Sequence, residues 1–252
     1  MKRAAVALLL LMPLTACGGD GDDGQTLTVL AAASLTETFT DLAATFEDEH
    51  PGVRVELVFG SSTTLAEQAA DGAPGQVLAT ADEVSMGVAD DAGVLAAAPV
   101  GFVGNSLTVV TPSDNPAGIT SLDDLDGREV DYVVCAATAP CGAAAEALLG
   151  SAGIDAPPAS EEVDVKAVLA RVVQGEADAG LVYRTDAVAA GDDVAEVAIP
   201  DADEVTTTYV VAPLTGADDA TADLAADFVA LVRSDEARAV FTDAGFGEVA
   251  AP

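Results

Sequence analysis

Serine residues follow two apolar segments of the chain, at the points where helices are predicted to begin. Residues 26–33 form an apolar run that ends in small side chains, and Ser34 comes directly after it. Residues 53–59 alternate as a strand does, and Ser61 and Ser62 follow after one glycine. A hydroxyl at the start of a helix lies beside the free N–H groups of the first turn, and together they attract anions. The pattern therefore indicates an anion site made of neutral donors, although a capping role alone also explains each serine.

The residues that most often carry out catalysis are scarce. His50 is the only histidine, and it stands at an acidic helix end before Pro51, where we expect it to be solvated. The chain contains no G-x-S-x-G, P-loop or dinucleotide-binding motif, and its carboxylates lie in no distinctive pattern. A binding protein is therefore favoured over an enzyme. A secreted hydrolase and a surface lipoprotein without any ligand remain as less favoured alternatives.

The N-terminal residues have the composition of a secretory signal peptide. Two basic residues precede an apolar segment over residues 4–14, which is too short to span a membrane. Residues 14–17 (LTAC) resemble the lipobox of bacterial lipoproteins, in which the cysteine is lipidated after cleavage. We therefore expect removal of residues 1–16, lipidation of Cys17, and a flexible acidic tether over residues 17–25. The mature protein would then be extracytoplasmic and anchored to the cell membrane.

Acidic residues dominate the charge of the chain. Nine Lys and Arg residues stand against 43 Asp and Glu residues, which gives a formal net charge of −34 at pH 7. Such a charge repels polyanions, so nucleic acid and anionic membrane surfaces are excluded as direct partners. It also means that any small anion must be held against the field of the whole molecule.

Two cysteines remain once Cys17 is assigned to the lipid anchor. Cys135 and Cys141 are close in sequence, and disulfides persist in an exported protein, so we expect a local bridge between them. Two free buried thiols are the alternative. A zinc site is less favoured because His50 is far from both cysteines in sequence.

Strands and helices are predicted to alternate along most of the chain. The predicted strands are an apolar run from residue 26 and residues 53–59, 77–81, 106–110, 129–134, 179–183, 194–199 and 206–212. The predicted helices are residues 35–46, 65–70, 82–86, 121–125, 142–149, 166–174, 185–188, 224–232 and 234–241. This alternation is typical of a largely parallel sheet with right-handed crossovers. Ligands of such sheets bind beyond the carboxyl ends of the strands, where both serines are predicted to lie.

Five short motifs occur along the chain in a recognisable order. They are residues 31–36 (AAASLT), 59–62 (FGSS) with 64–66 (TLA), 72–74 (GAP) with 81–82 (AD), 104–107 (GNSL), and 180–183 (GLVY) with 186–188 (DAV). Together they resemble the periplasmic molybdate-binding protein family, over about residues 26–248. The resemblance implies an α/β, two-lobed periplasmic-binding-protein fold (type II), in which each lobe is a mostly parallel sheet flanked by helices and the ligand cleft lies between the lobes. It also implies capture of molybdate or tungstate and delivery to the membrane permease of an ABC importer.

By this resemblance, six residues would contact the oxygen atoms of the anion: Ser34, Ser62, Ala81, Cys141, Val165 and Tyr183. The serines would offer hydroxyl and backbone N–H groups, Tyr183 its phenol, and the other three backbone N–H groups. The metal atom of the anion would have no direct protein ligand, and no cofactor is implied. Two residues depart from the family, since Cys141 replaces an alanine and Gln76 replaces a common aspartate. Each site residue also has a structural interpretation, as a helix cap, a packing residue or a core tyrosine.

A receptor for another solute or oxyanion, such as sulfate, is the main alternative. Ferric iron would need clustered tyrosines, whereas Tyr132, Tyr183 and Tyr209 are scattered in sequence. An amino acid would need a paired arginine and aspartate, for which Arg184 and Asp186 are the only weak candidates. A cleft of neutral donors suits a dianion such as molybdate, because dipoles surround it without a buried counter-charge.

The two lobes are predicted to divide the chain unequally. The first lobe takes residues 26–106 and 209–252, and the second takes residues 107–208. The apolar strands near residues 106 and 209 are placed at the crossings, so we expect ligand binding to close a hinge between the lobes. We also expect a monomer.

Overall fold

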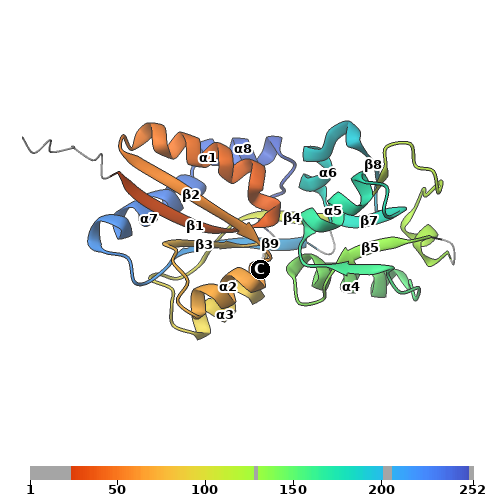
Figure 1. Cartoon of the computed structure of the whole chain (residues 1–252), viewed down its shortest axis with the longest axis horizontal. Helices are drawn as coiled ribbons and strands as arrows, with labels where there is room; N and C mark the ends of the chain where they lie inside the picture. The colour runs from red at the N-terminus through yellow and green to blue at the C-terminus, as the bar shows by residue number, and fades with distance from the viewer. Residues whose placement is uncertain (1–23, 128–129, 201–205, 250–252) are drawn as a thin grey trace, which may run out of the picture.

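The computed structural model describes residues 24–127, 130–200 and 206–249. Nine strands form one sheet in the order β2-β1-β3-β9-β4-β7-β5-β6, and β8 pairs with β4 beside this path. The sheet runs along the long axis of the molecule, with helices on both of its faces (Figure 1). The predicted signal peptide, Cys17 and most of the tether lie outside the described residues.

Three parallel strands form one end of the sheet. β1 (Gln25–Ala32) lies between β2 (Val53–Gly60) and β3 (Val77–Thr80). One face is covered by α1 (Thr36–Glu49), α7 (Asp219–Val232) and α8 (Asp235–Asp243), and the other by α2 (Ser62–Ala70) and α3 (Glu83–Asp91) (Figure 1). A 3-10 turn, η1 (Ala33–Leu35), joins β1 to α1.

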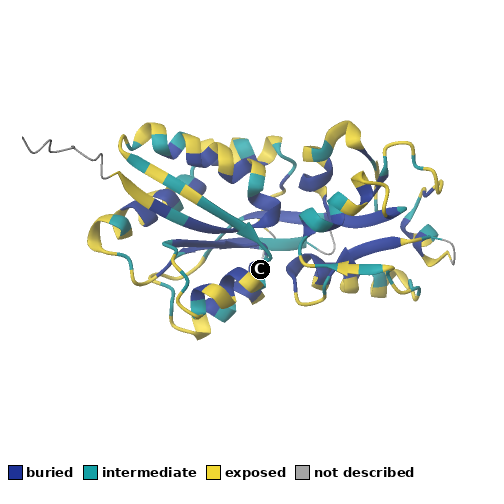
Figure 2. Ribbon diagram, in the orientation of Figure 1, coloured by how far each residue is buried: buried dark blue, intermediate teal, exposed yellow. Residues whose placement is uncertain are grey.

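The apolar face of α1 is buried as its sequence predicts. Phe39, Leu42 and Phe46 recur at helical spacing, and each is at most 1% exposed. The rings of Phe39 and Phe46 pack edge-on against Phe228 of α7, at centroid distances of 5.9 and 5.4 Å. Figure 2 shows the same division across the molecule, since the central strands are buried and the outer faces of the helices are exposed.

Three further parallel strands form the other end of the sheet. β5 (Tyr132–Cys135) lies between β6 (Ser160–Glu162) and β7 (Ala179–Tyr183). The helix α4 (Pro140–Ala152) covers one face, and α5 (Val165–Val173) and α6 (Arg184–Ala190) cover the other (Figure 1). The remaining short elements are η2 (Leu122–Asp126), η3 (Gly191–Asp193) and β8 (Val194–Val197).

Two long strands connect these ends. β4 (Val100–Pro112) pairs with β9 (Thr206–Pro213) along its first half and with β7 and β8 along its second half, in each case antiparallel. The expected parallel arrangement is therefore confirmed at both ends of the sheet and replaced by an antiparallel one at the centre. The reason is that the chain leaves the first end along β4 and returns to it along β9. The lobe boundaries near residues 106 and 209 stay a prediction.

Several helices begin earlier than predicted. α2 begins at Ser62 rather than residue 65, α4 at Pro140 rather than residue 142, and α5 at Val165 rather than residue 166. The earlier starts bring three predicted site residues into the first turns of their helices. Within the described residues, none of the helices combines the length and hydropathy needed to cross a membrane.

Candidate functional site

A small cavity lies at the carboxyl ends of β1, β2 and β7, and five of the six predicted site residues line it. They are Ser34, Ser62, Cys141, Val165 and Tyr183. The cavity leaves about 20 Å³ for the centre of a water-sized sphere. This is room for one small ligand, whereas an amino acid or a sugar needs a much larger pocket.

Three of these residues lie in the first turn of a helix. Ser62 is the first residue of α2, Val165 is the first of α5, and Cys141 is the second of α4. Backbone N–H groups in a first turn have no acceptor within their own helix, and the helix dipole makes this end positive. Three helix N-termini therefore meet at one cavity, an arrangement that favours an anion.

Neither of the two predicted serines caps a helix. The Oγ atom of Ser62 accepts a hydrogen bond of 2.9 Å from the backbone N–H of Ala81. The Oγ atom of Ser34 lies 2.7 Å from the phenolic oxygen of Tyr209. Both serines are buried, and other residues occupy the N-cap positions of η1, α1 and α2. The capping interpretation is therefore wrong, and Ala81 is linked to the cavity through Ser62.

Tyr183 ends β7 with its hydroxyl group buried and unpaired. Tyr183 lines the cavity, and its Oη atom has no hydrogen-bond partner among the described residues. The hydroxyls of Thr207 and Tyr209 lie near it without the geometry of a hydrogen bond. Burial raises the pKa of Tyr183, so the phenol keeps its proton and remains a donor. A buried donor without an acceptor is costly, so a ligand that offers an oxygen atom to Tyr183 would be bound favourably.

A disulfide shapes the loop that carries Cys141. The predicted bridge between Cys135 and Cys141 is confirmed, and it ties the end of β5 to the first turn of α4. The alternative of two free thiols is therefore wrong. Gly142 follows directly, and a Cβ atom there would lie 1.9 Å from the carbonyl oxygen of Ala136. The first turn of α4 packs against this loop so closely that only glycine fits.

We expect Gly142→Ala to lower the free energy of unfolding by about 1–3 kcal/mol, because the backbone must move to relieve the overlap. Gly150→Ala is the matched control in the same helix, since a Cβ atom there meets nothing within 4 Å. That control should gain up to about 1 kcal/mol through helix propensity. Urea unfolding of both variants measures the difference, and equal stability would show that the loop is not tightly packed.

Lys166 joins three helices beside the cavity. Its Nζ atom lies 2.8 and 2.9 Å from the two carboxylate oxygens of Glu37 in α1, and 3.0 Å from Oδ1 of Asp186 in α6. Asp186 is completely buried, while the side chains of Lys166 and Glu37 are 26% and 50% exposed. This group of three side chains was not predicted from the sequence. A signal was present, because Lys166 is the only lysine after Lys2.

Burial and ion pairing have opposite effects on the pKa of the Asp186 carboxyl. Burial raises the pKa of Asp186 to about 6, although the charge of Lys166 opposes the shift. Burial alone would lower the pKa of Lys166, but Asp186 and Glu37 together raise it above its ordinary value. The ion pair is therefore formed at neutral pH, at a cost that comes from the burial of Asp186.

The free energy of unfolding should depend on pH through Asp186. Its pKa is about 3.9 when unfolded and about 6 when folded, so the folded state holds the proton more tightly. This contribution is fully present below about pH 4 and is lost as the pH rises through 6, a change of about 3 kcal/mol. We expect the stability of the wild type relative to Asp186→Asn to fall by most of this amount between pH 4 and 7. A difference that stays constant in urea titrations over this range would contradict the assignment.

His50 does not have the solvated position expected from the sequence. Its ring stacks on Phe46 with centroids 4.0 Å apart, and its Nδ1 atom lies 2.9 Å from the Phe46 carbonyl oxygen. Its Nε2 atom lies 3.7 Å from a carboxylate oxygen of Asp227. The apolar ring of Phe46 holds the imidazole at the end of α1 opposite to the cavity.

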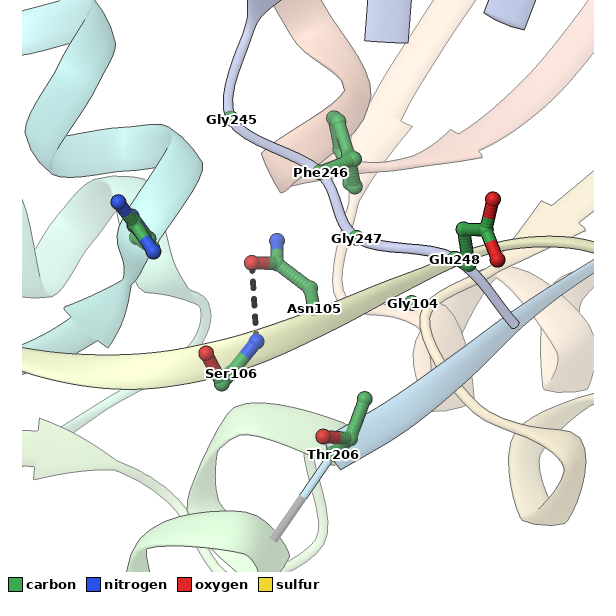
Figure 3. A pocket seen from close by; sticks show the side chains of 9 residues that line it. Gly104, Asn105, Ser106, Thr206, Gly245, Phe246, Gly247 and Glu248 are labelled. Atoms are coloured by element: carbon green, nitrogen blue, oxygen red, sulfur yellow. Dashed lines mark hydrogen bonds between the residues drawn. The ribbon is translucent and has the colours of Figure 1, made fainter. Parts of the chain in front are cut away.

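The structure disfavours two alternative ligands considered from the sequence, ferric iron and an amino acid. Tyr183 and Tyr209 are distant in sequence but neighbours in the structure, with ring centroids 5.9 Å apart. Burial raises the pKa of both, which disfavours the phenolates that ferric iron would need. Arg184 is exposed and lines a separate pocket of about 380 Å³ (Figure 3), whereas Asp186 pairs with Lys166. The two therefore do not form the pair that an amino acid would need.

Gln76, which the resemblance marks as a departure from the family, bonds to the backbone of β1. Its side-chain Oε1 atom accepts a hydrogen bond of 2.7 Å from the backbone N–H of Thr28. The backbone N–H of Gln76 in turn donates to the carbonyl oxygen of Thr28. Gln76 does not line the cavity. The departure at this position thus holds β1 in place and adds no donor to the site.

Comparison with known proteins gives consistent matches along the chain. The family described as bacterial extracellular solute-binding protein matches residues 27–247. The molybdate-binding protein ModA of Mycobacterium tuberculosis is 36% identical over 257 residues, which cover 98% of each chain. The structure of the periplasmic molybdate-binding protein of Azotobacter vinelandii has a TM-score of 0.77 at 20% identity, covering 90% of this chain and 99% of its own. The sulfate-binding protein SubI of Mycobacterium tuberculosis also has a TM-score of 0.77 at 20% identity, with coverages of 88% and 86%. These likenesses confirm the expected two-lobed fold.

Proposed function

Because this chain belongs to the molybdate-binding protein family of bacterial extracellular solute-binding proteins, we propose that it binds molybdate or tungstate in the cavity beside Ser34 and Ser62. The single observation that supports this most is the buried phenol of Tyr183, a donor without an acceptor among the described residues. An oxygen of the anion would supply that acceptor.

The donors around the cavity suit a dianion. The hydroxyls of Ser34, Ser62 and Tyr183 and the backbone N–H groups of Cys141 and Val165 all carry hydrogen and no charge. Helix dipoles add partial positive charge without a buried cation. Ala81 contributes by holding the Ser62 oxygen, so that the hydrogen of Ser62 is free to face the anion. The metal atom needs no protein ligand in this arrangement, and no cofactor takes part.

Sulfate is the second candidate, because the sulfate-binding protein SubI has the same fold. Both anions are tetrahedral, and neutral donors serve either of them. The size of the cavity then decides between them, since a larger ion makes closer contact with donors spaced for it.

A thermal-shift panel of molybdate, tungstate, sulfate, phosphate and chromate tests the proposal. A ligand at a hundred times its Kd should add about 2.7 kcal/mol to the free energy of unfolding. We expect molybdate and tungstate to act at the lowest concentrations. Tyr183→Phe, which keeps the ring and removes the donor, should need a higher concentration for the same shift. Stabilisation by sulfate alone would favour the second candidate, and no response to any oxyanion would contradict an oxyanion receptor.

We further propose that the protein works outside the cytoplasm and passes its ligand to the permease of an ABC importer. The N-terminal sequence supports export, with removal of residues 1–16 and a lipid on Cys17. Mass analysis of the mature N-terminus tests the anchor. A chain that keeps residues 1–16, or that carries an unmodified Cys17, would contradict it.

A further inference from the structure

A chain of buried polar contacts lies behind Ser34. The Oγ atom of Ser34 is 2.7 Å from Oη of Tyr209, and Nδ2 of Asn105 is 3.4 Å from the same Oη atom and 3.0 Å from Oγ1 of Thr185. All four residues are at most 5% exposed. They come from η1, β9, β4 and α6, so the contacts join both ends of the sheet. We name Asn105, Tyr209 and Ser34 the Ser34 relay.

The orientation of Asn105 sets the direction of the relay. Its Oδ1 atom accepts a hydrogen bond of 3.1 Å from the backbone N–H of Ser106 (Figure 3). The amide nitrogen must therefore face Tyr209 and Thr185, and an amide nitrogen only donates. Tyr209 accepts from Asn105, which leaves the phenolic hydrogen of Tyr209 free to point at Ser34.

Tyr209 is held as a neutral donor in a fixed place. Burial raises its pKa well above the ordinary value, so the phenol keeps its hydrogen. Its ring packs edge-on against Phe102, Tyr183 and Phe246, at centroid distances of 6.3, 5.9 and 5.3 Å. Because the ring cannot turn away, its hydroxyl stays directed at the Ser34 oxygen.

We propose that Asn105 and Tyr209 are positioning residues that make the Ser34 hydroxyl a donor toward the bound oxyanion. A serine oxygen that accepts from Tyr209 has its own hydrogen left for the cavity. Ser62 is arranged in the same way, with the Ala81 N–H in the role of Tyr209. The inference rests on the proposed function and adds to it residues that do not line the cavity.

Titration calorimetry with molybdate tests the relay through a double-mutant cycle. Tyr209→Phe removes one hydrogen bond behind Ser34 and should weaken binding about threefold to tenfold. In a Ser34→Ala background the same change should alter affinity less than about twofold, since the group on which it acts is gone. An equal loss in both backgrounds would overturn the proposal, because Tyr209 would then have a purely structural role. No loss in either background would overturn it as well.

Two further variants separate positioning from packing. Tyr132→Phe is the matched control, because it also removes a buried tyrosine hydroxyl, which donates to the carbonyl oxygen of Ala156; its affinity should stay that of the wild type. Asn105→Asp keeps the size of the side chain and replaces the donor with an acceptor. The new carboxylate would attract the hydrogen of Tyr209 away from Ser34, so binding should weaken at least as much as in Tyr209→Phe. Wild-type affinity in this variant would overturn the proposed direction.

NMR of the ligand-free protein tests the same direction without any anion. Because Tyr209 is fully buried, its hydroxyl hydrogen should exchange slowly and show a nuclear Overhauser effect to the β-hydrogens of Ser34. An effect to Asn105 alone would overturn the relay even if molybdate binds. Failure of the wild type to bind any oxyanion, together with the effect to Ser34, would instead remove the proposed function and leave the hydrogen-bond direction established.

Discussion

Replacing Ser34 or Ser62 with alanine is expected to weaken molybdate binding by about one to two orders of magnitude. Each change removes the hydroxyl of a residue that lines the cavity, which would leave an oxygen of the dianion without its donor. Hydrogen bonds to charged groups contribute roughly 1.5–3 kcal/mol, which corresponds to this loss. The loss of affinity in Ser62→Ala should lie at the upper end of this range, because the change also leaves the buried N–H of Ala81 without its acceptor.

Arginine variants supply the control for this experiment. Arg54 and Arg184 are exposed, and neither lines the small cavity. Arg54→Ala and Arg184→Ala should change affinity little, and any change should shrink as salt is added, because an exposed charge acts through a screened field. Titration calorimetry of the four variants decides the matter. Loss of binding in an arginine variant, with both serine variants unaffected, would place the site elsewhere.

The second large effect is expected on stability. Lys166→Met should lower the free energy of unfolding by about 3–5 kcal/mol near pH 8, because it leaves the completely buried Asp186 without its cation. Arg171→Met is the matched control in the same helix, since Arg171 pairs with Glu162 and Glu176 while 46% exposed. Exposed ion pairs contribute at most about 1 kcal/mol.

A double variant tests the cause of that loss. Lys166→Met combined with Asp186→Asn removes both charges, so most of the lost stability should return. Urea unfolding at pH 8 measures the stability of the wild type, Lys166→Met, Asp186→Asn and the double variant. If the double variant is no more stable than Lys166→Met alone, the loss comes from packing of the lysine side chain and not from the unpaired carboxylate.

Local sequence patterns predicted the strands that carry the site. The apolar run before Ser34 and the alternating run before Ser62 are both strands, and both serines reach the cavity because parallel strands end at the same edge. Cys135 and Cys141 were also predictable, since six positions separate them along one loop. In each case the relevant contact lies within one strand, one turn or one loop.

Contacts between distant segments were not predictable in this way. Ser34 and Tyr209 are 175 positions apart, and Glu37 and Lys166 are 129 positions apart. No periodicity links such residues, because their meeting depends on how β9 returns between β3 and β4. The same return makes the centre of the sheet antiparallel, which a count of alternating strands and helices does not reveal. The roles of Tyr209, Asn105 and Lys166 therefore became visible only in three dimensions.

The position of Lys166 gives the protein a built-in chemical reporter. In the mature chain proposed above, which lacks residues 1–16, Lys166 carries the only primary amine on any side chain. That amine is held between Glu37 of α1 and Asp186 of α6, where it is charged and therefore a poor nucleophile. An acylating reagent modifies it only when it leaves these carboxylates. The rate of labelling at this one atom thus reports how often the amine leaves Glu37 and Asp186.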